Sequence, residues 1–322
     1  MPSVSEAVAV LPAGGGIPGG NSDLKAIAPA WQRLLEEVIL PSRTGSSWNA
    51  YYGDVAVFLQ EHWRLPAAGR VNDIDNTTAS RGRDGDGALK EPLTTTNIGE
   101  RQHTHVFVEI GTAFGGLANF LLQSFPSSME VVAVDPFLPN YDVGDLQSQM
   151  LADIMDQLLQ LGILNSDITD DQQQYQHADQ SNGLGEVRAR EQFSRAWGEA
   201  LSFDLHRRHG CRYHGLRKLS VDAAASYQGF LGPSSTALDN GLVDAVFIDG
   251  LHTYEGVKED IGVWVPKLRK PGGLLIFNDY GNVEFPGVTR AADEFFEAHP
   301  EMELIIGAEG KPPGLGNAAV LF

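Results

Sequence analysis

The sequence predicts an α/β fold in which a mostly parallel sheet is covered by helices on both faces. Three observations support this prediction. Short apolar runs recur from residue 106 onward, patterns with one apolar helical face separate them, and glycine or a carboxylate follows several of the runs directly. Strands that are apolar on both faces and alternate with amphipathic helices are typical of a parallel sheet between two helical layers.

The expected elements follow one another along the chain. Apolar runs predict buried strands at 106–110, 131–134, 244–248 and 274–277. Apolar residues that recur every three or four positions predict helices over 116–123, around 257–264 and around 288–296. The chain ends with the runs 302–306 and 318–322, which a Gly/Pro-rich loop separates. We expect these last two runs to pair as an antiparallel hairpin.

The chain divides into three expected regions. Residues 1–22 are small and Gly/Pro-rich and predict a disordered leader, whereas 23–104 predict an N-terminal helical extension that passes into a polar linker. Residues 105–322 form the expected main domain. Within it, the segment at about 140–205 is rich in Gln and Asp and interrupts the alternation of strands and helices. This insertion is predicted to be either a lid over the functional site or a surface loop.

Composition argues against several classes of protein. A net charge of −19 disfavours binding to a nucleic-acid backbone or to an anionic membrane surface. No apolar run approaches the roughly 18 residues of a membrane helix. Cys211 is the sole cysteine, so an internal disulfide and a cysteine-based zinc site are excluded. The first residues lack the basic character of a secretory or transit signal, and we therefore expect a cytoplasmic protein.

A glycine-rich turn follows the first predicted strand. The segment Glu109–Gly116 has glycines at 111, 115 and 116, where the backbone can turn tightly and approach a ligand. A dinucleotide-binding turn has its second glycine two residues after the first, so the spacing here differs. The acid before the first glycine, Glu109, suits a cationic amino-acid group. The second strand ends at Asp135, which could accept both hydroxyls of a ribose or could serve only the turn before Pro136.

Two later strands also end in carboxylates. Asp249 follows the strand at 244–248, Asp279 follows the strand at 274–277, and Asn278 stands beside it. Ligands of open α/β sheets bind at the carboxyl ends of the strands, where we expect these side chains to converge. Two carboxylates and an amide suit Mg²⁺ or another hard divalent cation. Such a cation could bind two vicinal oxygens of a substrate and lower the pKa of one of them.

A histidine, His252, lies three residues after Asp249. It could accept a proton from the substrate as a general base, or it could be a metal ligand. A purely structural interpretation is also open, in which Asp249 and Asp279 cap strand ends and His252 caps the next helix. Three other histidines, at 206, 209 and 214, are closely spaced, but their setting favours exposed or structural roles.

Over roughly residues 104–322, these motifs resemble those of class I S-adenosylmethionine-dependent methyltransferases. Glu109-x-Gly111-x-x-x-Gly115-Gly116 resembles their first motif, and Asp135 resembles their ribose-binding acid. The stretch 213–224 resembles their third strand and the turn beside the adenine. The resemblance implies a doubly wound, seven-stranded, Rossmann-like sheet. It also implies that S-adenosylmethionine is bound by Glu109, Gly111, Thr112, Gly115, Gly116 and Asp135.

The segments 249–255 and 272–280 resemble a narrower, family 24-like group that includes sugar, macrolide and antibiotic-tailoring O-methyltransferases. That group usually has Asp-Asp where this chain has Asn278-Asp279. Catechol-type O-methyltransferases have an Asp-Asn pair at the equivalent place, and their base lies three residues after the first metal-binding Asp, as His252 does. The resemblance implies a metal site at Asp249, Asn278 and Asp279, with His252 and Asp249 as catalytic residues.

The expected function is therefore methyl transfer from S-adenosylmethionine to a hydroxyl of a small-molecule acceptor, aided by a divalent metal. A non-catalytic module of the same fold, which binds a nucleoside cofactor or a protein, is the alternative. The glycine spacing speaks against an NAD-dependent oxidoreductase. Nitrogen acceptors are less favoured, because the Asn/Asp-Pro-Pro-Tyr motif usual for them is replaced by Ile248-Asp249-Gly250-Leu251. A homo-oligomer is left open.

Overall fold

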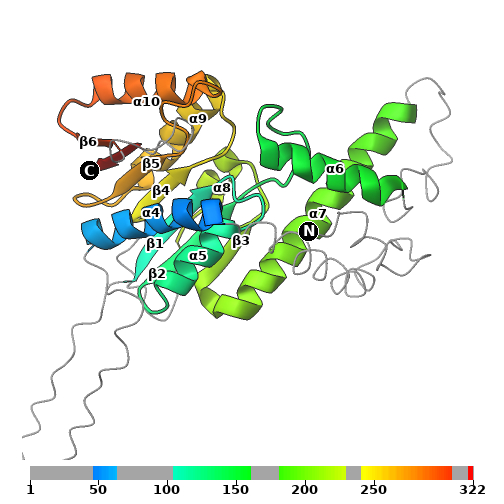
Figure 1. Ribbon diagram of the computed structural model, residues 1–322, viewed down its shortest axis with the longest axis horizontal. Helices are drawn as coiled ribbons and strands as arrows, with labels where there is room; N and C mark the ends of the chain where they lie inside the picture. Colours follow the sequence, from blue (N-terminus) through cyan, green and yellow to red (C-terminus); the bar gives the residue numbers. More distant parts are fainter. Residues whose placement is uncertain (1–45, 64–103, 161–180, 230–240, 307–317, 322) are drawn as a thin grey trace, which may run out of the picture.

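The computed structural model describes residues 46–63, 104–160, 181–229, 241–306 and 318–321 (Figure 1). The predicted leader and nearly all of the predicted polar linker lie outside these residues. In the part that is described, one sheet has the strand order β3-β2-β1-β4-β5-β7-β6. No helix among the described residues has the length and hydropathy of a membrane span.

The sheet is parallel except at one side. The parallel strands are β1 (His105–Ile110), β2 (Met129–Val134), β3 (Tyr213–Leu216), β4 (Ala245–Ile248) and β5 (Leu274–Phe277). Two antiparallel strands, β6 (Glu303–Ile306) and β7 (Ala318–Leu321), complete the sheet next to β5. The predicted α/β class, the mostly parallel sheet and the antiparallel pairing of the last two strands are therefore confirmed.

The register brings three strand ends level with one another. Ile110 of β1 lies opposite Ile248 of β4, and Ile248 lies opposite Phe277 of β5. The chain segments that follow these strands therefore start at the same edge of the sheet, which is the predicted arrangement.

Helices cover both faces of the sheet. The described helices are α4 (Ser46–Trp63), α5 (Gly116–Ser124), α6 (Leu146–Gln160), α7 (Ser181–His209), α8 (Ser220–Ser226), α9 (Tyr254–Trp264) and α10 (Pro286–Ala298). Phe107 and Val108 are consecutive in β1, so their side chains point to opposite faces. Phe107 belongs to a buried cluster with residues of α4, α5, α6 and α7, whereas Val108 belongs to one with residues of α8, α9 and α10. This is a doubly wound arrangement.

The start of α9 is set by a side-chain cap. Thr253 is the N-cap, and its hydroxyl accepts the backbone N–H of Gly256 at 3.2 Å. A threonine at this position satisfies one of the free N–H groups at a helix start. The interpretation of His252 as the cap of this helix is therefore wrong, and its ring is available for other contacts.

The segment predicted as an insertion, at about 140–205, contains α6 and most of α7. Leu151, Ile154 and Leu158 are buried on one face of α6, as its apolar spacing predicts. α6 and the start of α7 lie to the side of the sheet in Figure 1. The later part of α7 buries Phe193, Trp197, Leu201 and Leu205 in the core, and the helix runs past residue 205 to His209. This later part is therefore a helix of the core rather than a surface loop.

The N-terminal helix α4 is also part of the core. Tyr52, Val55 and Leu59 are buried, and α4 packs against α5. We expect Leu59→Ala to lower the free energy of unfolding by about 2–5 kcal/mol, because a fully buried leucine leaves a cavity when it is truncated. The control Val57→Ala removes a side chain that is 52% exposed and should change it by about 0.5 kcal/mol or less. Urea unfolding of both variants measures this. Equal effects would show that α4 does not belong to the core.

Candidate functional site

Two cavities open at the carboxyl edge of the parallel strands. The first has a volume of about 340 Å³ and is lined by residues that include Asp135, Ser220 and Leu251. The second has a volume of about 350 Å³ and is lined by residues that include Glu109, Asp279 and Phe285. Gly111, Asp145, Gln147 and Asp249 line both, so the two cavities meet. Each is in the size range of small-molecule sites.

Gly111 allows the turn after β1 to touch the turn after β4. Its φ is +86°, which favours glycine, and a Cβ atom at this position would lie 1.8 Å from the backbone oxygen of Asp249. The backbone N–H of Asp249 in turn donates to the oxygen of Ile110 at 2.9 Å. The close contact that requires this glycine is therefore with the protein's own backbone at the point where the two cavities meet.

The next residues of this turn face different partners. A Cβ on Gly115 would lie 2.8 Å from Leu205 of α7, and a Cβ on Gly116 would contact the hydroxyl of Tyr52 of α4. The packing of α7 and α4 thus gives a reason for both glycines. Thr112 is 3% exposed and lines the second cavity, and its hydroxyl has no hydrogen-bond partner among the described residues. Glu109, also buried, lines the same cavity.

Asp135 fixes the backbone of the glycine-rich turn. Its Oδ2 accepts the N–H of Ala113 at 2.6 Å, and its Oδ1 accepts the N–H of Phe137 at 2.5 Å. Burial raises the pKa of the Asp135 carboxyl to about 6, although these two hydrogen bonds oppose the rise. The side chain therefore serves the local turn and also lines the first cavity, where each oxygen retains lone-pair capacity.

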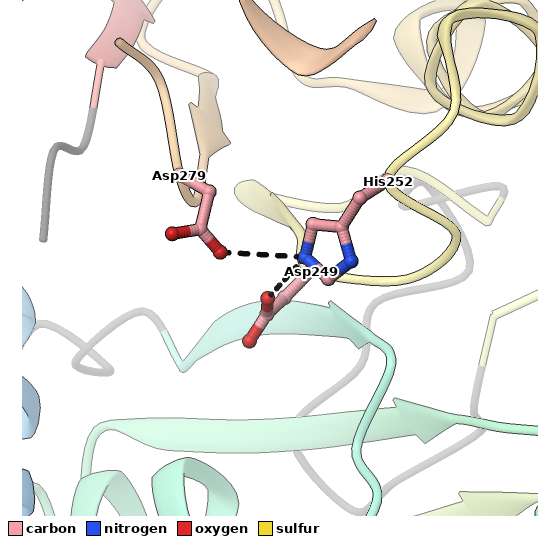
Figure 2. Close-up of side chains that lie close together, drawn as sticks. All are labelled: Asp249, His252 and Asp279. Atoms are coloured by element: carbon pink, nitrogen blue, oxygen red, sulfur yellow. Dashed lines mark hydrogen bonds and ion pairs between the residues drawn. The ribbon is translucent and has the colours of Figure 1, made fainter. Parts of the chain in front are cut away.

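Figure 2 shows the central cluster of the site, formed by Asp249, His252 and Asp279. The Nε2 atom of His252 lies 3.4 Å from Oδ1 of Asp249 and 3.3 Å from Oδ2 of Asp279. One possible ligand atom from each residue lies within 4.8 Å of those of the other two. Asp279 has a φ of 56°, a left-handed conformation that aspartate tolerates better than most residues. The strand ends thus bring two carboxylates and one imidazole together, as predicted.

The pKa values of two side chains in the cluster, His252 and Asp249, are shifted by burial and by their mutual contacts. Burial would lower the pKa of the His252 imidazole, but its hydrogen bonds to Asp142, Asp249 and Asp279 outweigh burial and raise the pKa to about 12. Burial raises the pKa of Asp249 to about 6, although the contact with His252 lowers it. Without another cation, His252 is therefore an imidazolium that compensates the carboxylates.

The side chain of Asn278, which is predicted to offer a third oxygen ligand, turns its amide nitrogen toward the cluster instead. The amide nitrogen of Asn278 lies 2.5 Å from Oδ1 of Asp249 and 2.7 Å from Oδ2 of Asp279, and it donates to both. To serve as a metal ligand, Asn278 must turn its amide over and present the oxygen. The donor set nevertheless fits a hard divalent cation, because the buried carboxylate of Asp279 and the half-buried carboxylate of Asp249 face the same space. In the described structure, the His252 ring and the Asn278 amide nitrogen bridge them there.

Asp142 is a site residue that the sequence did not reveal. Its Oδ2 contacts both the backbone nitrogen and Nδ1 of His252, each at 2.8 Å. The ring of Phe285 stacks on His252 with 4.2 Å between the ring centroids. Asp142 and His252 are 110 positions apart, and no local motif marks the aspartate.

The histidines at 206, 209 and 214 do not form a cluster in the structure. His209 contacts the side chain of Asn119 at 2.8 Å, and His214 contacts Glu130 at 3.4 Å. Over the ranges that the structure describes, one group of three or more His, Cys, Asp or Glu side chains could hold a metal ion. It consists of Asp249, His252 and Asp279.

Comparisons with known proteins bear on the family of the chain. A family model described as a methyltransferase domain (methyltransferase family 24) matches residues 108–280, which is more than half of the 322 residues. A search of curated proteins finds no match.

Solved structures with a similar arrangement include the calicheamicin methyltransferase CalS11, with 13% identity, 95% of each chain covered and a TM-score of 0.44. An O-methyltransferase from Bacillus cereus in complex with SAH has 13% identity over 99% of this chain and 96% of that chain, with a TM-score of 0.39. The O-methyltransferase TomG from Streptomyces achromogenes has 14% identity over 68% of this chain and 73% of that chain, with a TM-score of 0.32.

The family assignment rests on the family model, whose match spans the glycine-rich turn, Asp135 and the cluster at the ends of β4 and β5. The chain belongs to this methyltransferase family and is a class I S-adenosylmethionine-dependent methyltransferase.

Proposed function

We propose that this methyltransferase transfers the methyl group of S-adenosylmethionine to a hydroxyl oxygen of a small molecule, with a divalent cation bound at Asp249, Asn278 and Asp279. One observation carries the proposal. The two cavities share Gly111 and Asp249, so that a cofactor whose nucleoside part lies in the first and whose methionine part reaches the second would meet an acceptor beside the acid cluster. Holding two reactants in contact is a large source of rate in such transfers.

In this proposal the first cavity binds the nucleoside part of the cofactor. Asp135 accepts the ribose hydroxyls, and the turn at Gly111, Thr112, Gly115 and Gly116 faces the rest of the cofactor. The buried carboxylate of Glu109, which lines the adjoining cavity, attracts the cationic amino group of the methionine part. The hydroxyl of Thr112, which has no hydrogen-bond partner in the described part of the chain, supplies a further polar contact.

The part of the second cavity beside Asp279 and Phe285 binds the acceptor. A divalent cation at Asp249, Asn278 and Asp279 would act as a Lewis acid that lowers the pKa of the acceptor hydroxyl. Phe285 lines the cavity and offers an aromatic face to the acceptor. Mg²⁺ is the expected ion, because the proposed ligands are oxygen atoms.

His252 is the proposed general base, and Nε2 is the nitrogen that faces the site. The carboxylates that now surround this ring hold its proton, as its raised pKa of about 12 indicates. His252 can therefore act as a base only when the charge of Asp249 and Asp279 is balanced by another cation. The metal and base roles are thus linked in the proposal.

Calorimetric titration with S-adenosylhomocysteine tests the cofactor part. We expect binding in the micromolar range to the wild type and none to Asp135→Ala, while NAD should neither bind nor compete. Methyl transfer to catechol, a probe with two vicinal hydroxyls, tests the hydroxyl part with Mg²⁺ and then with EDTA. Failure of the wild type to bind S-adenosylhomocysteine would contradict the proposed cofactor site.

The affinity for S-adenosylhomocysteine should fall below about pH 6. Burial raises the pKa of Asp135 from 3.8 to about 6, so the ionised form that accepts hydrogen bonds best is present above that pH and is lost below it. If only the ionised form binds, affinity drops about tenfold for each pH unit below the pKa. Titrations between pH 5 and 8 measure this. Asp135→Asn should bind more weakly with a flat profile, and a flat profile for the wild type would contradict the role of Asp135.

A further inference from the structure

The carboxylate of Asp142 divides its two oxygens between its own loop and His252. Its Oδ1 accepts the N–H of Gly144 at 3.1 Å. Its Oδ2 contacts the backbone nitrogen and Nδ1 of His252 at 2.8 Å each. An ionised carboxylate can only accept hydrogen bonds, so Nδ1 has to carry a hydrogen atom. Burial would raise the pKa of Asp142, but its contacts with His252 lower it below the ordinary value and keep it ionised.

The loop before α6 has other contacts that fix its shape. The backbone N–H of Asp142 donates to the hydroxyl of Ser148 at 3.1 Å. The side chain of Gln149 donates to the backbone oxygen of Val143 at 2.8 Å, and Asp145 accepts the N–H of Ser148 at 2.6 Å. The loop is thus tied to α6 without Oδ2 of Asp142. The described contacts of that oxygen are with His252.

The surroundings of His252 leave few orientations for its ring. The side chain is 6% exposed, and Phe285 stacks on one face at an angle of 23°. Stacking fixes the plane of the ring but does not distinguish its two edges. The contact with Asp142 does, because it places Nδ1 on the loop side and leaves Nε2 beside Asp249 and Asp279.

We propose that Asp142 is a positioning residue: its carboxylate accepts the hydrogen on Nδ1 of His252 and thereby holds the ring with Nε2, and not Nδ1, beside Asp249 and Asp279. This inference rests on the proposed function, in which His252 is the base. A carboxylate that orients a catalytic histidine through its far nitrogen also selects the tautomer, and losing that choice is costly to catalysis.

Nuclear magnetic resonance of the full chain with ¹⁵N-labelled histidine tests the inference directly. His252→Gln assigns the signals of His252. We expect a slowly exchanging proton on Nδ1 in the wild type and in Val143→Ala, a control that truncates a side chain of the same loop that is 76% exposed. In Asp142→Ala this proton should exchange at least about tenfold faster, because it loses a charge-assisted hydrogen bond. An unchanged exchange rate would overturn the inference.

Asp142→Asn keeps the size of the side chain and covers the case in which alanine disturbs the loop. Its neutral oxygen is a weaker acceptor, so we expect faster exchange at Nδ1 here as well, and an unchanged rate would again overturn the inference. The result does not depend on methyl transfer. If the wild type fails to bind S-adenosylhomocysteine, the proposed function fails. If the wild type binds S-adenosylhomocysteine but substitution of Asp142 leaves the exchange rate at Nδ1 unchanged, only the role of Asp142 fails.

Discussion

Asp249→Ala is expected to abolish binding of Mg²⁺ and to lower the rate of methyl transfer to catechol by about a thousandfold or more. The carboxylate of Asp249 is at the centre of the cluster, in contact with His252 and Asn278 and on the wall of both cavities. Its loss removes half of the paired negative charge that a divalent cation requires. Calorimetry with Mg²⁺ and initial rates measure the two effects.

Glu284→Gln is the matched control for this prediction. Glu284 is an exposed carboxylate that lines the second cavity, but it is not among the clustered side chains that could hold an ion. We expect its variant to bind Mg²⁺ within about twofold of the wild type, since an exposed charge acts weakly through water. Equal losses in both variants would mean that general negative charge, and not this cluster, attracts the ion. Retention of binding in Asp249→Ala would refute the metal site.

Gly111→Ala should destabilise the protein by about 3 kcal/mol or more and abolish binding of S-adenosylhomocysteine. A Cβ at this position would lie 1.8 Å from the backbone oxygen of Asp249, and the φ of +86° is unfavourable for alanine. Either β1 and β4 separate at their ends or the turn changes shape. Both outcomes alter the junction of the two cavities. Thermal unfolding and calorimetry of the same variant measure the two losses.

Gly53→Ala provides the control for a glycine with space around it. A Cβ on Gly53 meets no heavy atom within 4 Å, and the residue lies within α4. Alanine should raise stability there by about 0.5–1 kcal/mol, because glycine is a poor helix former. If Gly111→Ala behaved in the same way, the close approach of the two turns would not limit the site.

The sequence predicted the sheet and the positions of the strand ends well, because both are local properties. The apolar runs gave four strands, and their alternation with helices implied a parallel register, which brings Asp249 and Asp279 to one edge. The interpretation of the glycines was less complete. The motif predicts cofactor contacts for Gly115 and Gly116, and the structure adds α7 and Tyr52 of α4 as close neighbours.

Other features depend on contacts between distant parts of the chain. Asp142 is an ordinary aspartate in the sequence and becomes significant through a contact with a residue 110 positions away. The later part of α7 carries enough polar residues to suggest a surface insertion, yet its aromatic residues Phe193 and Trp197 are buried in the core. The orientation of Asn278 depends on its charged neighbours, which no single motif can describe.

The boundaries of the family match differ from those of the folded unit. The match ends at residue 280, before β6 and β7, and begins at residue 108, after α4. In the whole protein, β7 pairs with β5, from Leu274 opposite Leu321 to Phe277 opposite Ala318. A recombinant fragment cut at the family boundaries would leave β5 as an open edge and uncover the core face under α4. Because unpaired apolar edges recruit strands from other molecules, such a fragment should precipitate or form aggregates.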